Sequence, residues 1–188
     1  MTPKKTYDVA VIGSGPAGEK AALEAASLKV RVVVIEKGYN PGGASVITGT
    51  IPSKSLRETV QDLNAIKQSE LSGLDATYNK KITINELMHR KKAVVSNRVK
   101  YIFQKYHENK IDYLYGEGIF KDCNTLKIIT NDGSTIEIRA KKFIIAVGTR
   151  PYHPPNVDFD GKYILDSDSI LSLDYIPEEM AVFGGGVI

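Results

Sequence analysis

Cysteine and long apolar runs are scarce in this sequence, and each shortage excludes a class of protein. The 188 residues include one cysteine, Cys123, which rules out an intramolecular disulfide and a cysteine-rich metal site and fits a reducing cytosol. The longest apolar stretches, such as Phe143–Val147, are far shorter than the roughly 20 residues that span a bilayer. The basic residues 1–5 lead into a strand pattern and not into an apolar signal core. We therefore expect a globular, cytoplasmic protein without a membrane partner.

An excess of one charge is also missing. The 25 lysines and arginines nearly balance the 22 aspartates and glutamates, and the formal net charge of +3 is too small and too dispersed to indicate a nucleic-acid partner. The densest basic stretch is His89–Lys92 with Arg98, Lys100 and Lys105. It lies in a helical pattern whose other side is apolar, so we interpret it as a solvated face. The three histidines show neither metal-ligand spacing nor a Ser-His-Asp arrangement.

The pattern that is present alternates strands with helices. Tyr7–Ile12 is a short apolar run typical of a strand buried in a parallel sheet. A helix is predicted from Pro16 to Leu28, and Arg31–Ile35 predicts the next strand. The later expectations are a helix at Ser53–Ile66, a loop at Gly73–Lys81, a helix from Thr83 with a Thr83/Glu86 capping box, strands at Asp112–Tyr115, Thr125–Thr130, Thr135–Arg139 and Phe143–Val147, and a hairpin turn at Asn131–Gly133.

Glycine-rich turns are predicted near both ends. The segment 13–18 (GSGPAG) follows the first strand, and Gly184–Gly186 follows a second strand pattern at Met180–Phe183. Two such turns about 170 residues apart predict an internal repeat with one dinucleotide site each. We divide the chain into a nucleotide-binding domain (1–150, its N-terminal portion), a linker (151–175) and the truncated start of a second such domain (176–188). We expect the chain to be an N-terminal part of a longer protein.

The first glycine turn has a mechanical interpretation. Gly13 permits a tight turn, Gly15 lets a pyrophosphate approach the backbone, and Gly18 lets the helix and strand pack closely. The pyrophosphate would then lie at the helix N-terminus, where free amides and the helix dipole favour an anion. Glu36 ends the second strand 18 residues after Gly18, where a carboxylate can accept hydrogen bonds from ribose hydroxyls. A dinucleotide site is therefore predicted, although this motif does not separate FAD from NAD.

The following segment resembles a flavin site. Residues 42–54, GGASVITGTIPSK, closely resemble the redox segment of flavoprotein disulfide reductases, GGxCxxxxCxPSK, in which two cysteines lie beside the flavin. Ser45 and Thr50 stand at the two cysteine positions. Because neither hydroxyl can form a disulfide or a thiolate, reduction of a disulfide substrate is disfavoured.

Residues 49–58 and 143–171 also resemble the flavin-dependent, soluble pyridine nucleotide transhydrogenase family, which has threonine at the Thr50 position but usually keeps the first cysteine. The resemblance covers nearly the whole chain. It implies an α/β, Rossmann-like FAD-binding domain with a parallel sheet and an additional β-meander, followed by the first strand of an NAD(P)-binding unit. The implied activity of the full-length oxidoreductase is hydride transfer from NADPH to NAD⁺ through FAD, in a homo-oligomer whose dimer domain lies beyond this chain.

The resemblance assigns residues by position. Lys54 would lie near flavin N5, where its ammonium would stabilise the reduced ring, and Thr50 is the second candidate catalytic residue. Gly118 would meet the adenine, and Ala146–Gly148 would close over the FAD. The full implied cofactor set is Gly13, Ser14, Gly15, Pro16, Ala17, Gly18, Glu36, Lys37, Gly42, Gly43, Ser45, Gly49, Thr50, Lys54, Gly118, Ala146, Val147 and Gly148, with no metal site.

Two other functions remain open from the sequence. One is a flavin oxidoreductase of similar build that passes its electrons to a quinone, to oxygen or to a partner protein. The other is an FAD-binding piece without turnover. Because the nicotinamide and dimer domains implied by the resemblance would lie beyond Ile188, we expect this chain by itself to transfer no hydride.

Overall fold

The computed structural model describes residues 5–71 and 83–186, so the predicted loop at Gly73–Lys81 lies outside the described residues. One six-stranded sheet has the strand order β3-β2-β1-β6-β5-β4. The pairs β1–β2, β1–β6 and β2–β3 are parallel, whereas β4–β5 and β5–β6 are antiparallel. The strands are β1 (Lys5–Ile12), β2 (Val32–Glu36), β3 (Asp112–Tyr115), β4 (Glu117–Asp122), β5 (Thr125–Ile129) and β6 (Thr135–Ile145).

Two helices begin where the sequence predicts, whereas the helix predicted at Ser53–Ile66 extends from Thr50 to Leu71 and α2 was not predicted. α1 starts at Pro16, as expected, and α4 starts after Thr83, whose hydroxyl accepts the Glu86 amide while the Glu86 carboxylate accepts the Thr83 amide. No helix among the described residues is long and apolar enough to cross a membrane. The helices are α1 (Pro16–Ser27), α2 (Gly43–Ile47), α3 (Thr50–Leu71), α4 (Ile84–Glu108) and a short 3₁₀ turn, η1 (Ser169–Ser172).

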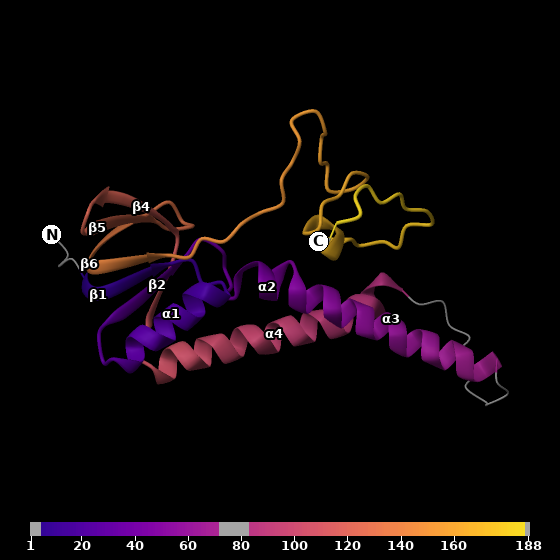
Figure 1. The fold of residues 1–188 in the computed structure, drawn as a ribbon, viewed down its shortest axis with the longest axis horizontal. Coiled ribbons are helices and arrows are strands. Elements are labelled where there is room, and N and C mark those ends of the chain that lie inside the picture. The colour runs from indigo at the N-terminus through magenta and orange to yellow at the C-terminus, as the bar shows by residue number, and fades with distance from the viewer. Residues whose placement is uncertain (1–4, 72–82, 187–188) are drawn as a thin grey trace.

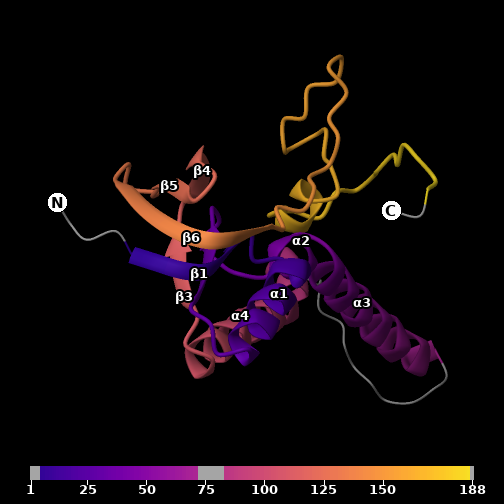
Figure 2. The same ribbon diagram turned by 60° about the vertical axis from the view of Figure 1, so that its left-hand side comes forward.

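The sheet is covered by a different layer on each face (Figures 1 and 2). Alternate residues of β2 divide between two cores: Val32 and Val34 face the helical layer of α1 and α4, while Val33 and Ile35 face β5 and β6. The β4–β5–β6 meander folds back over the parallel part, because a Cβ added to Gly118 of β4 would lie 3.6 Å from Cγ2 of Ile35. The predicted α/β class with a parallel sheet and a β-meander is therefore confirmed.

The prediction of two strands at 135–139 and 143–147 was wrong, since β6 is one continuous strand ending at Ile145. Its residue Ile138 pairs antiparallel with Leu126 of β5 and parallel with Lys5 of β1. The charged residues between the two apolar runs do not break the strand, because Lys142 still pairs with Val9. β4 was not predicted at all, because most of its side chains are exposed and give no apolar alternation.

The strand expected at Met180–Phe183 is also absent. These residues are irregular, and the Phe183 side chain is 98% exposed. The physical reason is that a strand needs a neighbour to pair with, and none of the described strands lies beside this segment. The preceding residues do contact the helical layer, because the Lys91 ammonium of α4 donates a hydrogen bond to the Leu171 carbonyl of η1.

Candidate functional site

The turn at residues 13–18 joins β1 to α1 at the carboxyl end of the parallel strands. Gly13 has φ +97°, and its amide donates to the Ile35 carbonyl of β2 at 2.8 Å. Gly15 caps α1 and Pro16 begins it. The first amides of the helix, those of Ala17 and Gly18, therefore face the end of the sheet without a partner inside the helix. This geometry suits an anion.

Two of the three glycines in the turn are required by close backbone approach. A Cβ on Gly13 would lie 2.2 Å from the Ala146 carbonyl oxygen, and one on Gly18 would lie 2.0 Å from the Gly13 carbonyl oxygen. Ala146 is held in place because its amide donates to the Ile12 carbonyl at 2.8 Å. Residues 146–147, which follow β6, therefore contact the turn. The sequence analysis assigned both segments to the same cofactor.

A second glycine pair packs against the same turn. The Gly42 amide donates to the Ser14 carbonyl at 3.0 Å, and a Cβ on Gly43 would lie 2.8 Å from Cα of Gly15. Gly42 has φ +117° and Gly43 has φ +56°, so both adopt backbone conformations that favour glycine. The structure thus brings Gly42 and Gly43 together with the first turn, although they are distant in sequence.

Glu36 connects β2 to the turn. Its Oε2 accepts from the Ser14 amide at 2.9 Å and from the Ser14 hydroxyl at 2.7 Å, and its Oε1 accepts from the Gly38 amide at 2.9 Å. Ser14 is fully buried, so this carboxylate holds the turn against the end of β2. Each carboxylate oxygen has two lone pairs, so Glu36 keeps acceptor capacity for a ribose hydroxyl. The sequence predicts Glu36 as an acceptor of ribose hydroxyls, but it does not predict the hydrogen bonds from Ser14.

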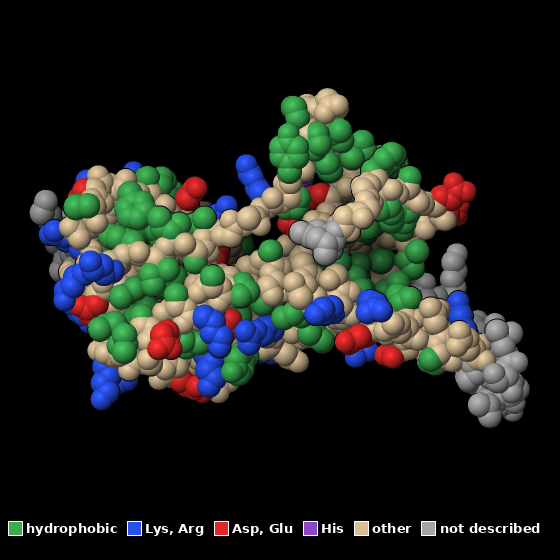
Figure 3. All heavy atoms as spheres, viewed as in Figure 1, with side chains coloured by type: hydrophobic (Ala, Val, Ile, Leu, Met, Phe, Trp, Pro, Cys, Tyr) green, Lys and Arg blue, Asp and Glu red, His purple; other side chains and the backbone are tan. Residues whose placement is uncertain are grey.

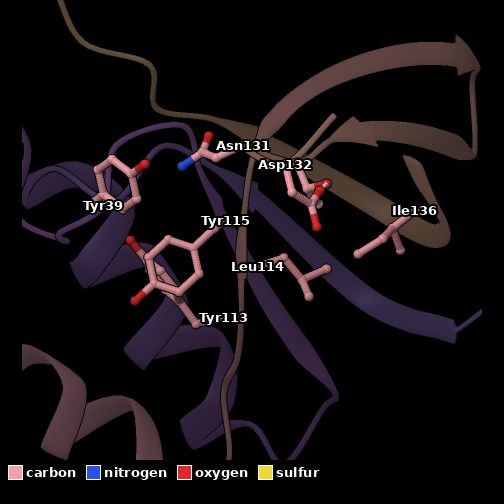
Figure 4. A pocket seen from close by; sticks show the side chains of 8 residues that line it. Tyr39, Tyr113, Leu114, Tyr115, Asn131, Asp132 and Ile136 are labelled. Atoms are coloured by element: carbon pink, nitrogen blue, oxygen red, sulfur yellow. Dashed lines mark hydrogen bonds between the residues drawn. The ribbon is translucent and has the colours of Figure 1, made fainter. Parts of the chain in front are cut away.

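A pocket of about 550 Å³ opens beside Glu36. Tyr115, which pairs with Glu36 in the sheet, contributes to it, as does Tyr39 from the loop after β2. Figure 4 shows the side chains of Tyr39, Asn131 and Tyr115 gathered at one end of the pocket. The sequence analysis did not single out this pocket, because its walls come from three separate segments. The lining residues are Tyr39, Tyr113, Leu114, Tyr115, Thr130, Asn131, Asp132 and Ile136.

The interpretation of Arg98 as part of a solvated face was wrong. Its Nη2 lies 2.9 Å and 2.8 Å from the two carboxylate oxygens of Glu19, a buried residue of α1. A signal for this was available, because Arg98 lies four residues before Ile102 and eight before Tyr106, on the same buried side of α4. Lys91 of the same stretch is also half-buried, and its ammonium donates to the Leu171 carbonyl. Figure 3 shows acidic and basic side chains interspersed over the helical layer.

Tyr106 is buried between α4 and the sheet, where its ring stacks on that of Tyr113 of β3. Its hydroxyl has no hydrogen-bond partner among the described residues. Burial, followed by the negative charges of Glu19 and Glu36, raises the pKa of this hydroxyl well above its usual value.

The residues assigned to the flavin lie on the two helices that follow the second glycine pair. Ser45 is on α2 and half-buried, while Thr50 and Lys54 are exposed on the first turns of α3. Gly49 lies between the helices, where a Cβ would come within 3.0 Å of the Ala44 carbonyl oxygen. The remaining assigned residues are the exposed Lys37 after β2, the half-buried Gly118 in β4, and Val147 and Gly148, both exposed after β6.

The chain matches known proteins over nearly its whole length. Residues 7–188 match the pyridine nucleotide-disulphide oxidoreductase family. The soluble pyridine nucleotide transhydrogenase of Erwinia tasmaniensis is 42% identical over 188 residues, which are 100% of this chain and 40% of that protein. The corresponding protein of Colwellia psychrerythraea is 38% identical over 182 residues, or 97% of this chain and 39% of that protein. The chain thus spans about two fifths of the length of these curated relatives.

Solved structures show the same architecture. LpdA from Mycobacterium tuberculosis superposes with a TM-score of 0.79 at 27% identity, covering 91% of this chain and 38% of that one. The HOCl-induced flavoprotein disulfide reductase RclA from Escherichia coli superposes with a TM-score of 0.73 at 25% identity, covering 92% of this chain and 36% of that one.

Proposed function

The chain belongs to the pyridine nucleotide-disulphide oxidoreductase family, and from this premise we propose that it forms the FAD-binding part of a flavoprotein that transfers hydride between NADPH and NAD⁺. In this proposal residues 1–150 belong to the FAD-binding domain, 151–175 form a linker, and 176–188 begin the NAD(P)-binding domain. The observation that carries the proposal is the glycine turn at 13–18, packed against Gly43 and Ala146 and tied to Glu36.

The residues present fit FAD. Gly15, at the N-cap of α1, has no side chain, and even an added Cβ would meet only Cα of Gly43, at 3.9 Å, so a pyrophosphate could approach the amides of Ala17 and Gly18 there. Glu36 would accept the adenosine ribose hydroxyls, and its negative charge would repel a 2′-phosphate. The neighbouring pocket supplies the rings of Tyr39 and Tyr115 and the Asn131 amide, a surface suited to a planar adenine.

Direct hydride exchange is favoured over disulfide reduction by the residues at positions 45 and 50. When bound, FAD supplies the two-electron chemistry, accepting hydride from one nicotinamide and passing it to another. Ser45 and Thr50 cannot store those electrons as a thiolate pair. Lys54, exposed on the first turns of α3, would place a positive charge beside the reduced ring and stabilise it.

The test uses the protein reconstituted with FAD. We expect the full-length protein to be yellow and to reduce a thio-NAD⁺ analogue with NADPH. Reduction of lipoamide or glutathione through thiols, reduction of quinones alone, or failure to bind FAD would contradict the proposal.

Lys54→Met sharpens this test. In the full-length protein, removing the ammonium should slow flavin reduction by NADPH about tenfold or more in stopped-flow absorbance, because each tenfold corresponds to about 1.4 kcal/mol of lost stabilisation. The matched control is Lys92→Met, which removes an exposed lysine of α4 and should leave the rate unchanged. An unchanged rate for Lys54→Met would refute the role of Lys54.

A further inference from the structure

The ion pair between Glu19 and Arg98 connects the start of α1 to α4. The side chain of Glu19 is 7% exposed and that of Arg98 is 34% exposed, with 2.8 Å between Arg98 Nη2 and Glu19 Oε2. The second carboxylate oxygen of Glu19 is 2.9 Å from the same nitrogen. A carboxylate this deeply buried requires a compensating charge, and Arg98 provides it from the neighbouring helix.

The position of Glu19 conflicts with anion binding. It is the acidic residue in the first turn of α1, one helical turn after Gly15. A lone carboxylate there is favourable for the helix dipole but repels a second anion arriving at the same terminus. Glu36, tied to Ser14 at the other side of the turn, adds a second negative charge.

We propose that Arg98 is a positioning residue for the dinucleotide: its guanidinium neutralises Glu19 and so keeps the N-terminus of α1 attractive to the pyrophosphate. The inference rests on the proposed FAD function and adds to it a residue that does not touch the cofactor.

A purely mechanical clamp between α1 and α4 would be the alternative role. The two roles differ in what happens when the charge of Glu19 is removed. A clamp is weakened by loss of either partner, whereas charge compensation is needed only while Glu19 is ionised. Glu19→Gln therefore separates them.

The experiment titrates apoprotein with FAD and follows quenching of flavin fluorescence. Arg98→Met should raise the FAD dissociation constant on the order of tenfold, because it leaves an uncompensated charge near the pyrophosphate. Glu19→Gln should bind FAD at least as tightly as the parent protein. The FAD dissociation constant of the double variant Glu19→Gln/Arg98→Met should lie within about threefold of the parent value, because residue 19 then carries no charge to compensate.

Arg98→Lys keeps the charge but loses the planar guanidinium. This variant keeps the inference testable if Arg98→Met does not fold. If Arg98→Met fails to fold, parent-like binding by both Arg98→Lys and Glu19→Gln supports the inference, and weakened binding by Glu19→Gln overturns it. Parent-like binding by folded Arg98→Met also overturns it. Failure of the parent protein to bind FAD would instead refute the proposed function from which the inference starts.

Discussion

The two glycine-rich segments of this chain have similar sequences and very different surroundings. Their first glycines, Gly13 and Gly184, have φ values of +97° and +110°. In the first segment, Cβ atoms added to Gly13 and Gly18 would collide with backbone at 2.2 Å and 2.0 Å. In the second, Cβ atoms added to Gly184, Gly185 or Gly186 would meet nothing within 4 Å.

The difference shows what a glycine motif alone establishes. It marks where the backbone can turn, but the site at 13–18 is made by contacts from elsewhere in the chain. Ala146 closes on Gly13, Gly43 on Gly15, and Glu36 binds Ser14. Residues 184–186 have no such contacts within the described part of the chain.

The largest expected effect separates the two segments directly. Gly18→Ala should lower the free energy of unfolding by about 3 kcal/mol, because its Cβ overlaps the Gly13 carbonyl and the backbone must shift. Gly185→Ala, the matched control, should change it by less than about 0.5 kcal/mol. Urea denaturation measures both, and equal effects would show that the first turn is no more tightly packed than the second segment.

A smaller effect is expected from the anchor of the first turn. Glu36→Gln replaces a charged acceptor of the Ser14 and Gly38 amides by a neutral amide, and should cost about 1–2 kcal/mol of stability. It should also weaken FAD binding, measured by the same fluorescence titration. Glu178→Gln, at an exposed position of the second region, should change neither quantity. Parent-like FAD affinity for Glu36→Gln would contradict the ribose role.

The smallest effect concerns Tyr106 and depends on pH. Because its hydroxyl is buried without a hydrogen-bond partner among the described residues, Tyr106→Phe should change stability at pH 7 by less than about 1 kcal/mol. The pKa of Tyr106 is raised in the folded state, while that of the unfolded state is near 10. The folded state therefore keeps its full stability below about pH 10 and loses it as the pH rises further.

Tyr106→Phe should remove part of that alkaline loss. Urea unfolding at pH 8 and pH 11 checks this. The free energy of unfolding of the variant should rise relative to that of the parent protein only at pH 11. Tyr163→Phe, at a side chain that is 78% exposed, should follow the parent at both values. An alkaline loss as large in Tyr106→Phe as in the parent would show that this hydroxyl does not titrate on unfolding.

Local signals predicted the fold well where the deciding contacts are close in sequence. The run from β1 to β2, the capping box at Thr83 and the hairpin turn before Gly133 all follow from short patterns. The Gly133 amide donates to the Thr130 carbonyl at 2.9 Å, as that turn requires. The α/β class could therefore be predicted from the sequence.

Sequence patterns failed where the structure depends on contacts between residues that are distant in sequence. The Met180–Phe183 pattern favours a strand, but a strand forms only beside a neighbour. The sequence analysis groups Arg98 with the other surface cations, because its partner Glu19 lies on α1, far away in sequence. The pocket beside Glu36 needs Tyr39, Tyr115 and Asn131 from three segments. The contacts assigned to Lys54 and Ser45 with the flavin, and to Gly118 with the adenine, remain predictions.

The double pairing of β6 also bears on how the chain acquires its structure. Lys5, at the start of the first strand, pairs with Ile138, so most of the chain must be synthesised before that ladder can close. Contacts with so large a separation slow folding, because the entropy of closing a long loop is lost before the contact is gained. During translation one edge of β1 would stay unpaired, and the first glycine turn would lack its contact with Ala146, until β6 has left the ribosome.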